Sequence, residues 1–471
     1  MRPRARPLSF ADVEWQAQGV ALEATLQAVA DFLDAHADLV SLVHQDLVRG
    51  LKQPRTGRGG LSAAQVLRAF VLQRIKAWDL RELRERIADG YTLRQFTAFD
   101  SQPVPKHDAF HRAFCRLTPA TVRALNDAVV QAAVTRGLED GAALRVDTTV
   151  VETDIHWPTD STLLWDAVRV ITRLVKRVGE QVPSARQGFA DRTRRARRRM
   201  LEISRVSGTD RARQQRRPYR DLLGITADVV ATARAAVVTA RAASPAGPLA
   251  AAVVRGLCAE IEHVCGLADR VLTQTRRRVL DGDQVPVAEK VFSIFESHTD
   301  LIKRGKTQRP VEFGHKVLLA ESRHGLITDY RVLTGNPPDE GHVAPSLARH
   351  ETTFGHVPTL YAADRGFYTR ANVQTLTAAG VVTECVPQRG GRKTPERIAH
   401  ETSHAFKRGQ RFRAGIEGRI SVLLRGRGMR RCPLEGRDRF EVFVGVAVLA
   451  NNLLRIAALL VQTAARRRRA A

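Results

Sequence analysis

Apolar residues recur at helical spacing between residues 61 and 136, which predicts a run of short helices there. The pattern Ser62-x-x-Gln65 is a capping box in front of one apolar stripe. Thr118-Pro119 has the residue types of an N-cap followed by the first helical position. We therefore expect this part of the chain to be helical, preceded by a basic helical segment over residues 1–60.

One of these helices, predicted over residues 106–117, has a basic outer face. Phe110 and Phe114 fall on its inner side, whereas Arg112 and Arg116 fall on its outer side. Short helices with a basic outer face are typical of helix-turn-helix DNA readers, although any small helical bundle in so basic a chain has the same pattern. We therefore predict a helical DNA-binding region over residues 61–140, with Arg112 and Arg116 contacting DNA.

Strand patterns replace the helical ones from Ala143 onward. The predicted strands are 143–151, 311–320, 326–333, 359–363 and 381–386, and the predicted helices are 369–379 and 412–424. Ser322-Arg-His-Gly325 joins the second and third of these strands as a hairpin turn. Since strands and helices alternate after the hairpin, we expect a sheet built from a hairpin plus parallel additions. The predicted fold class is α+β or α/β, with more than one domain.

A long helical insertion separates the first strand from the hairpin, over about residues 160–285. Residues 186–220 contain 13 Arg against three acidic residues, so this stretch is either a solvated face or a phosphate-binding track. Further along, apolar residues alternate three and four apart from Val254 to Val271, which is a coiled-coil seam. The seam is either a contact between subunits or part of a helical hairpin within one chain.

The charge balance points to a polyanionic partner. Among 471 residues, 75 Lys and Arg against 49 Asp and Glu give a formal net charge of +26, while 44% hydrophobic residues exclude wholesale disorder. So large a surplus causes self-repulsion, and binding to a polyanion is the usual reason to carry it. Nucleic acid is the first candidate.

Membrane and secretory signals are not expected. The most apolar window, residues 443–461, contains Asn451, Asn452 and Arg455, which are costly inside a bilayer, so we predict a core helix there. The basic start of the chain has no apolar segment of the secretory type. Five scattered cysteines are typical of reduced thiols, and the expected compartment is the cytoplasm.

Three acidic residues occupy informative positions. Asp147 lies in the middle of a predicted strand, where a carboxylate is disfavoured. Asp364 follows the apolar run LYAA and so lies at the carboxyl end of a strand, where α/β sheets bind their ligands. Glu417 lies on the predicted helix 412–424, four residues after Arg413. These carboxylates are candidates for a single site.

Converging carboxylates suit Mg²⁺ or Mn²⁺, because both ions prefer oxygen ligands. Two such ions about 4 Å apart can clamp a phosphodiester for in-line attack by water or a 3′-hydroxyl. The alternative is purely structural: each aspartate pairs with a nearby arginine, Arg145 or Arg365, and Glu417 forms a helix salt bridge with Arg413.

Four separated stretches resemble bacterial insertion-sequence transposases of the DDE type, most similar to the ISNCY group. They are VDTTVVETDIHWPTDS at 146–161, FSIFESHT at 292–299, ADRGF at 363–367 and FRAGIEGRIS at 412–421. The resemblance extends over roughly residues 60–460 and rests on several motifs rather than one.

The resemblance implies a ribonuclease H-like catalytic domain over residues 141–460, interrupted by the helical insertion. Carried over residue by residue, it assigns the two catalytic aspartates to Asp147 and Asp364 and the catalytic glutamate to Glu417. It further implies two Mg²⁺ ions, cleavage of double-stranded DNA at terminal inverted repeats, and joining of the freed 3′-hydroxyl to target DNA. Holding two element ends together implies a homodimer or a higher assembly.

Further arginines are expected to contact phosphates. Arg413 lies on the helix that carries Glu417, and Arg425, Arg430 and Arg431 follow that helix. The Arg-rich residues 461–471 are expected to form a solvated basic tail that adds non-specific DNA affinity.

Two rival chemistries have weak support. His400-Glu-Thr-Ser-His404 fits the zinc-protease pattern, but no histidine follows it to supply a third ligand, and its flanks are too polar for a buried metal helix. Arg389-Gly-Gly-Arg392 lacks the lysine and the strand-to-helix setting of a nucleotide-binding loop. The competing functions that remain are a non-catalytic DNA-binding regulator descended from a transposase and a metal nuclease that cuts without joining.

Overall fold

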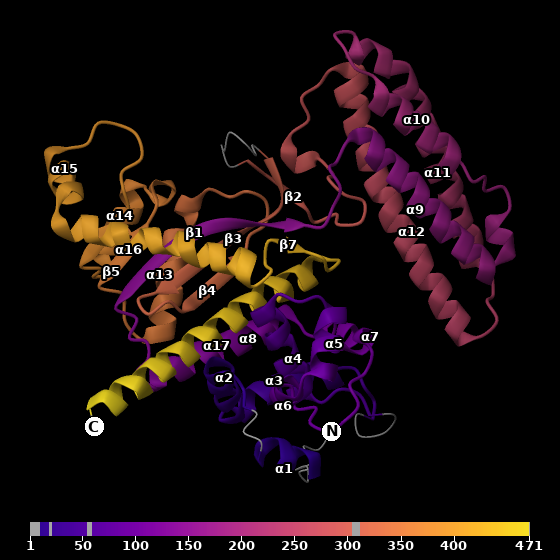
Figure 1. The fold of residues 1–471 in the computed structure, drawn as a ribbon. Helices are drawn as coiled ribbons and strands as arrows, with labels where there is room; N and C mark the ends of the chain where they lie inside the picture. The colour runs from indigo at the N-terminus through magenta and orange to yellow at the C-terminus, as the bar shows by residue number, and fades with distance from the viewer. Residues whose placement is uncertain (1–9, 18–20, 54–58, 304–310, 471) are drawn as a thin grey trace. The chain divides into compact units, whose positions relative to one another are not determined.

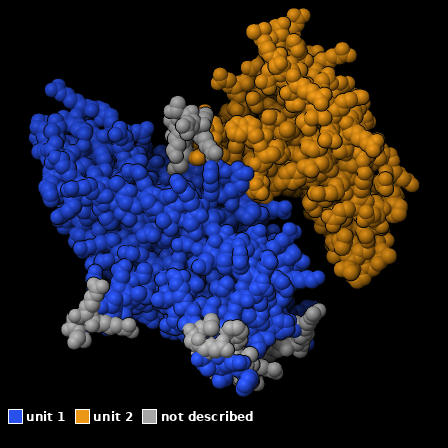
Figure 2. All heavy atoms as spheres, viewed as in Figure 1, with its two compact units in different colours: residues 1–152, 315–471 blue, residues 153–314 orange. Residues whose placement is uncertain are grey.

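The computed structural model describes residues 10–17, 21–53, 59–303 and 311–470. The chain divides into two compact units (Figure 2). The first, here called the sheet unit, comprises residues 1–152 and 315–471, and the second, the helical unit, comprises residues 153–314. The predicted DNA-binding region 61–140 belongs to the same compact unit as most of the sheet.

The N-terminal helices of the sheet unit form a bundle on the C-terminal helix α17 (Arg437–Ala470) (Figure 1). They are α2 (Ala24–Asp34), α3 (Ala37–Val48), α4 (Ala63–Lys76), α5 (Leu80–Asp89), α6 (Tyr91–Phe96), α7 (His107–Phe114) and α8 (Pro119–Thr135), and α1 (Phe10–Ala17) precedes them in the chain. The predicted capping box is confirmed, since Ser62 and Gln65 each accept the other's backbone N–H at the start of α4. Thr118 likewise caps α8 through the Thr121 N–H, with Pro119 as the first helical residue.

Seven strands among the described residues form one mixed sheet. They are β1 (Ala143–Thr153), β2 (Asp300–Lys303), β3 (Val311–Ser322), β4 (Ile327–Val332), β5 (Leu360–Ala363), β6 (Thr383–Cys385) and β7 (Arg431–Cys432). The order is β2-β3-β1-β5-β6, with β4 paired to β3 and β7 paired to β1. Strands β1, β5 and β6 run parallel, whereas β3 pairs antiparallel with β2 and with β4. The predicted α+β class and the hairpin are therefore confirmed.

Alternation along the strands gives the sheet two apolar faces. Leu318 of β3 packs with α13 (Val343–Phe354) and α14 (Arg370–Ala378), whereas Val317 and Leu319 pack with α17. Helix α16 (His404–Ser421), which follows α15 (Pro395–Thr402), packs on β5 and β6. Both faces are thus covered, which leaves the strand ends as the accessible part of the sheet.

The helical unit is built around α9 (Asp160–Gln181), α10 (Thr193–Arg205), α11 (Arg211–Ala242) and α12 (Pro248–Thr275). The predicted seam from Val254 to Val271 is buried in the core that α12 shares with α9 and α11. The seam is therefore an intramolecular contact. Of the two alternatives, the contact within one chain is confirmed and the contact between subunits is wrong. Apolar periodicity shows that a helix face is covered, but it does not show which helix covers it.

Two helices, α11 and α17, are long and apolar enough to cross a membrane by length and composition alone. In each, half or more of the apolar window is buried inside the protein, as in a core helix. Asn452 of α17 is fully buried and exchanges two hydrogen bonds with the backbone of Ile327.

Residues 461–470 continue α17 as helix, so the predicted basic tail is a helical extension.

Candidate acidic active site

Asp147 lies in the middle of β1 with its side chain only 12% exposed. Its Oδ1 accepts the Thr148 backbone N–H at 2.7 Å, and its Oδ2 lies 2.9 Å from Arg413 Nη2. Burial raises the pKa of Asp147 above its ordinary value, and the charges of Asp364 and Asp339 raise it further, while Arg413 and the Thr148 N–H oppose the shift. A buried carboxylate beside two others is a site that favours a cation.

Asp364 directly follows β5, the strand that runs parallel to β1. The register pairs Val146 with Ala363, so Asp147 and Asp364 are the next residues on two adjacent strands. The Asp364 carboxylate accepts the Gly366 N–H at 2.7 Å through Oδ1, and no other partner is found for it in the described part of the chain. The two aspartates therefore lie at neighbouring positions of adjacent strands in the interior of the sheet.

Glu417 reaches this neighbourhood from α16. Gly409 allows α16 to approach β6 closely, because an added Cβ at this position would overlap the Cys385 sulfur. One turn after Gly409, Arg413 Nη1 lies 3.0 Å from Glu417 Oε1 while its Nη2 holds Asp147. The side chain of Glu417 is 66% exposed. The helix salt bridge considered as the structural alternative for Glu417 is thus present, and the same guanidinium also holds Asp147.

Asp339 is a member of the cluster that sequence patterns missed. It begins a short 3₁₀ turn, and its Oδ1 accepts the Thr148 hydroxyl at 3.1 Å and lies 2.8 Å from Lys316 Nζ. Its charge raises the pKa of Asp147. The only signal in the sequence is its place in the loop NPPDEG, after the β4 strand, which does not distinguish it from an ordinary turn residue.

The donor set of the two strand aspartates fits a hard divalent cation. Asp147, in the middle of β1, and Asp364, at the carboxyl end of the adjacent parallel strand β5, supply carboxylate oxygens, and Asp339 adds a third charge nearby. Among the residues that the structure describes, neither Asp339 nor Glu417 completes with these two aspartates a group of three whose possible ligand atoms all lie within 4.8 Å of one another. Arg413 supplies positive charge between Asp147 and Glu417.

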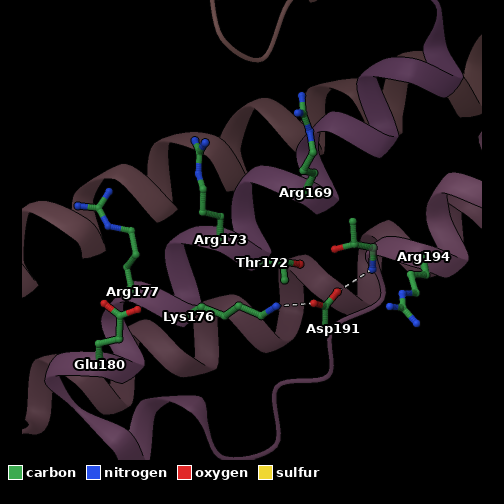
Figure 3. Close-up of a pocket in the computed structure, with 9 residues that line it drawn as sticks. Arg169, Thr172, Arg173, Lys176, Arg177, Glu180, Asp191 and Arg194 are labelled. Carbon is green, nitrogen blue, oxygen red and sulfur yellow. Dashed lines mark hydrogen bonds and ion pairs between the residues drawn. The ribbon is translucent and has the colours of Figure 1, made fainter.

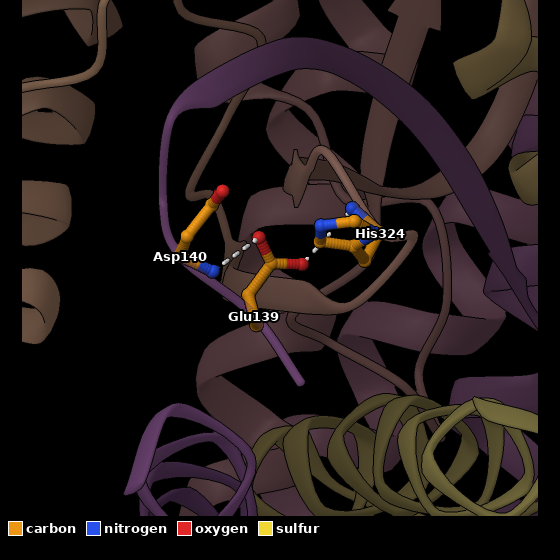
Figure 4. Close-up of side chains that lie close together, drawn as sticks. All are labelled: Glu139, Asp140 and His324. Carbon is orange, nitrogen blue, oxygen red and sulfur yellow. Dashed lines mark hydrogen bonds between the residues drawn. The ribbon is translucent and has the colours of Figure 1, made fainter. Parts of the chain in front are cut away.

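A second acidic group, Glu139, Asp140 and His324, does bring its possible ligand atoms within 4.8 Å of one another (Figure 4). Glu139 is 2% exposed, and its two oxygens accept four hydrogen bonds: from the Asp140 and Gly141 N–H groups, the Ser322 hydroxyl and the His324 N–H. Through these hydrogen bonds Glu139 links the hairpin turn to the start of β1. Because its lone pairs are already used, its carboxylate has little capacity left to bind a metal.

The zinc-protease pattern is divided between two helices. His400 lies on α15, which ends at Thr402, and His404 begins α16 after the break at Ser403. Glu401 is engaged by Lys393 and Arg397. The two imidazoles therefore do not share a helix face, which the zinc chemistry requires.

The arginines predicted to contact DNA fall into different environments. Arg112, Arg425 and Arg430 are exposed, as expected for such a role. Arg116 instead donates to the backbone carbonyls of Asp46 and Arg49, so it anchors the end of α3. Arg431 pairs with Glu152 at 2.8 Å, and Arg413 is held in the acidic cluster. Both are engaged by carboxylates, which a sequence pattern of basic residues does not show.

Comparisons with protein-family models, with curated proteins and with solved structures give no match to this chain. Its function therefore has to be inferred from the chemistry of the acidic site and from the charge of the protein.

Proposed function

We propose that the chain is a DNA transposase that cleaves phosphodiester bonds at the ends of an insertion element and joins the freed 3′-hydroxyl to target DNA. The observation that carries this proposal is the placement of Asp147 and Asp364 side by side on parallel strands, with Glu417 linked to Asp147 through Arg413. The strand order β4-β3-β1-β5-β6 also supports a ribonuclease H-like interpretation of the sheet. The net charge of +26 fits DNA as the substrate.

In this proposal Asp147, Asp364 and Glu417 would hold the divalent cations. Two such ions, when bound, activate the attacking oxygen and stabilise the leaving oxygen. Asp339 adds negative charge behind the two aspartates, and Lys316 limits the repulsion among them. Arg413 neutralises Asp147 and Glu417 and so keeps the acidic cluster compatible with folding.

The partners follow from this activity: terminal inverted repeats, target DNA and further copies of the chain. Because the α12 seam is buried within the helical unit, copies would have to associate through another surface. A bacterial transposase of this kind would act on DNA in the cytoplasm.

The test is a cleavage and joining assay on a plasmid that carries the gene's own flanking DNA. Wild type and Asp364→Asn are compared, each with Mg²⁺ and with EDTA. Metal-dependent cuts at the element ends with joined products, lost in the variant, are the expected result. Salt-sensitive binding of the ends without cleavage under Mg²⁺ or Mn²⁺ would instead establish the DNA-binding regulator, and cleavage without joined products would establish a nuclease.

A further inference from the structure

The helical unit contains a basic groove beside α9, with a volume of about 800 Å³ (Figure 3). Arg169, Arg173 and Arg177 stand four residues apart along α9 and line the groove, so their side chains repeat at about 6 Å along the helix. Lys176 of the same helix and Arg194 of α10 complete its five cations. Two carboxylates, Glu180 and Asp191, also line the groove, so its five cations leave an excess of three positive charges.

Three of these five cations have no acidic partner. Lys176 pairs with Asp191 at 2.5 Å, and Arg169 pairs with Asp166 at 2.7 Å. By contrast, Arg173, Arg177 and Arg194 form no ion pair or hydrogen bond with any other residue that the structure describes. Positive charge that the protein does not neutralise is available to an external anion.

The arginines at the start of α10 and along it differ in their partners according to the helix face on which they lie. Arg192, Arg195 and Arg199, spaced three and four apart, all turn toward acidic residues of α11 and pair with them at 2.8–3.7 Å. Arg194 lies on another side of α10, lining the groove. The arginines of the 186–220 stretch are thus not a uniformly solvated face: one set closes α10 onto α11, and the other faces outward without partners.

Three other arginines of the helical unit, two on α11 and one directly after α12, do have acidic partners. Arg234 pairs with Asp269, Arg241 with Glu262, and Arg277 with Glu289 and Asp283. Arg234 and Arg241 are exposed like the arginines of the groove, yet all three of these arginines have a carboxylate partner. The groove beside α9 therefore differs from this surface, because three of its arginines have no acidic partner among the described residues.

We infer that this groove is a binding track for the phosphate backbone of duplex DNA, separate from the acidic site. A row of unpaired guanidinium groups matches the regularly spaced phosphates of a polyanion better than a single small anion, and it contacts backbone without reading sequence. The choice of DNA as the polyanion rests on the proposed function. The groove would hold flanking DNA while the acidic site acts on the element end.

The test uses full-length protein and a fluorescently labelled 30-base-pair duplex of arbitrary sequence, with binding measured by anisotropy over a salt series. The groove variant is Arg173→Gln, Arg177→Gln and Arg194→Gln combined. The control variant is Arg234→Gln, Arg241→Gln and Arg277→Gln, which removes the same charge from the same unit. Since each phosphate contact contributes about 0.9 to the slope of log K against log salt, the groove variant is expected to lose about 2–3 from that slope and bind about tenfold more weakly.

The control variant is expected to keep the wild-type slope to within about 1. An unchanged slope in the groove variant would overturn the inference, and so would equal losses in both variants, since that is a net-charge effect. Saturable binding of inorganic tripolyphosphate with no effect of the groove variant on duplex binding would also overturn it in favour of a small anion. Thermal unfolding of both variants checks that the helical unit remains folded.

The same assay separates this inference from the proposed function. Asp364→Asn is expected to bind the duplex with the wild-type slope, because Asp364 lies in the sheet unit and not in the groove. If wild type fails to cleave element ends while the groove variant still loses its slope, the transposase proposal fails and the groove stands. If wild type cleaves and joins while the groove variant binds like wild type, only the groove inference fails.

Discussion

The Arg413 guanidinium on α16 donates to Asp147 Oδ2 on β1 at 2.9 Å and joins this carboxylate to Glu417. Arg413 therefore balances the charge of two residues that the proposed chemistry assigns to metal. A divalent cation that binds Asp147 and Glu417 has to compete with this guanidinium for both carboxylates. Arg413 is therefore a positioning residue, and its removal is expected to change the affinity of the site for divalent cations in a predictable direction.

Arg413→Gln is expected to strengthen divalent-cation binding several-fold, because the carboxylates of Asp147 and Glu417 lose their competing positive charge. Isothermal titration with Mn²⁺ measures the change in Kd. Arg425→Gln, which removes an exposed arginine close by in the chain, is the control and is expected to leave Kd unchanged. Equal or weaker Mn²⁺ binding by Arg413→Gln would show that the guanidinium and the metal do not share these ligands.

Glu321 is fully buried on β3 and holds two arginines, Arg145 at 2.7 Å and Arg419 at 2.9 Å. Glu321→Gln leaves both guanidinium groups without a counter-charge, so we expect a loss of about 3 kcal/mol in the free energy of unfolding. Urea denaturation measures this loss. The exposed i,i+4 pair of Glu82 and Arg86 provides the comparison, since Glu82→Gln should cost no more than about 0.5 kcal/mol.

Two glycines of α16 predict opposite effects of the same substitution. At Gly409 an added methyl group overlaps the Cys385 sulfur, so Gly409→Ala should push α16 away from β6, cost about 1–3 kcal/mol and lower strand joining. At Gly418 an added Cβ meets nothing within 4 Å, so Gly418→Ala should stabilise the helix by up to about 1 kcal/mol. Chemical denaturation of the two variants checks the contrast, and equal effects would contradict the packing described for α16.

The burial of His350 predicts how the free energy of unfolding changes with pH. Burial lowers its pKa to about 4, with Nε2 near the Gly141 carbonyl at 2.9 Å. Below its ordinary pKa of about 6.5, the unfolded chain binds a proton that the folded protein does not, so stability falls as the pH drops from about 6.5 toward 4. Between pH 7 and pH 5 this group alone should cost about 2 kcal/mol.

His350→Gln keeps a donor for the Gly141 carbonyl but does not titrate in this range. The variant should therefore lose about 2 kcal/mol less stability than wild type between pH 7 and pH 5. Urea denaturation at the two pH values measures both losses. Identical losses in the two proteins would show that His350 is not the group responsible.

Much of the sheet and its strand aspartates could be predicted because local patterns determine them. β-rich and apolar runs of residues predicted β1, β3, β4 and β5, and Asp364 directly follows the apolar run of β5. The adjacency of Asp147 and Asp364 follows from that register.

The rest depends on tertiary contacts that no local pattern encodes. Asp339 joins the cluster because a loop after β4 returns to β1, and Arg116 is removed from the predicted DNA surface because α3 ends against it. The seam of α12 has the period of a coiled coil, but its partners α9 and α11 lie in the same chain. Whether an arginine is paired depends on acidic residues of other helices, so the sequence does not show which arginines remain unpaired.

The measurement that tests the central claim most directly is metal-dependent joining of a pre-cut element end by Asp364→Asn and by Asp140→Asn. Each variant replaces one aspartate of a different acidic group by its amide, and Asp140 belongs to the group that includes Glu139 and His324. Our account predicts that Asp364→Asn abolishes joining in Mg²⁺ while Asp140→Asn joins at close to the wild-type rate. Wild-type joining by Asp364→Asn, or its loss only in Asp140→Asn, would contradict the assignment of the active site to Asp147, Asp364 and Glu417.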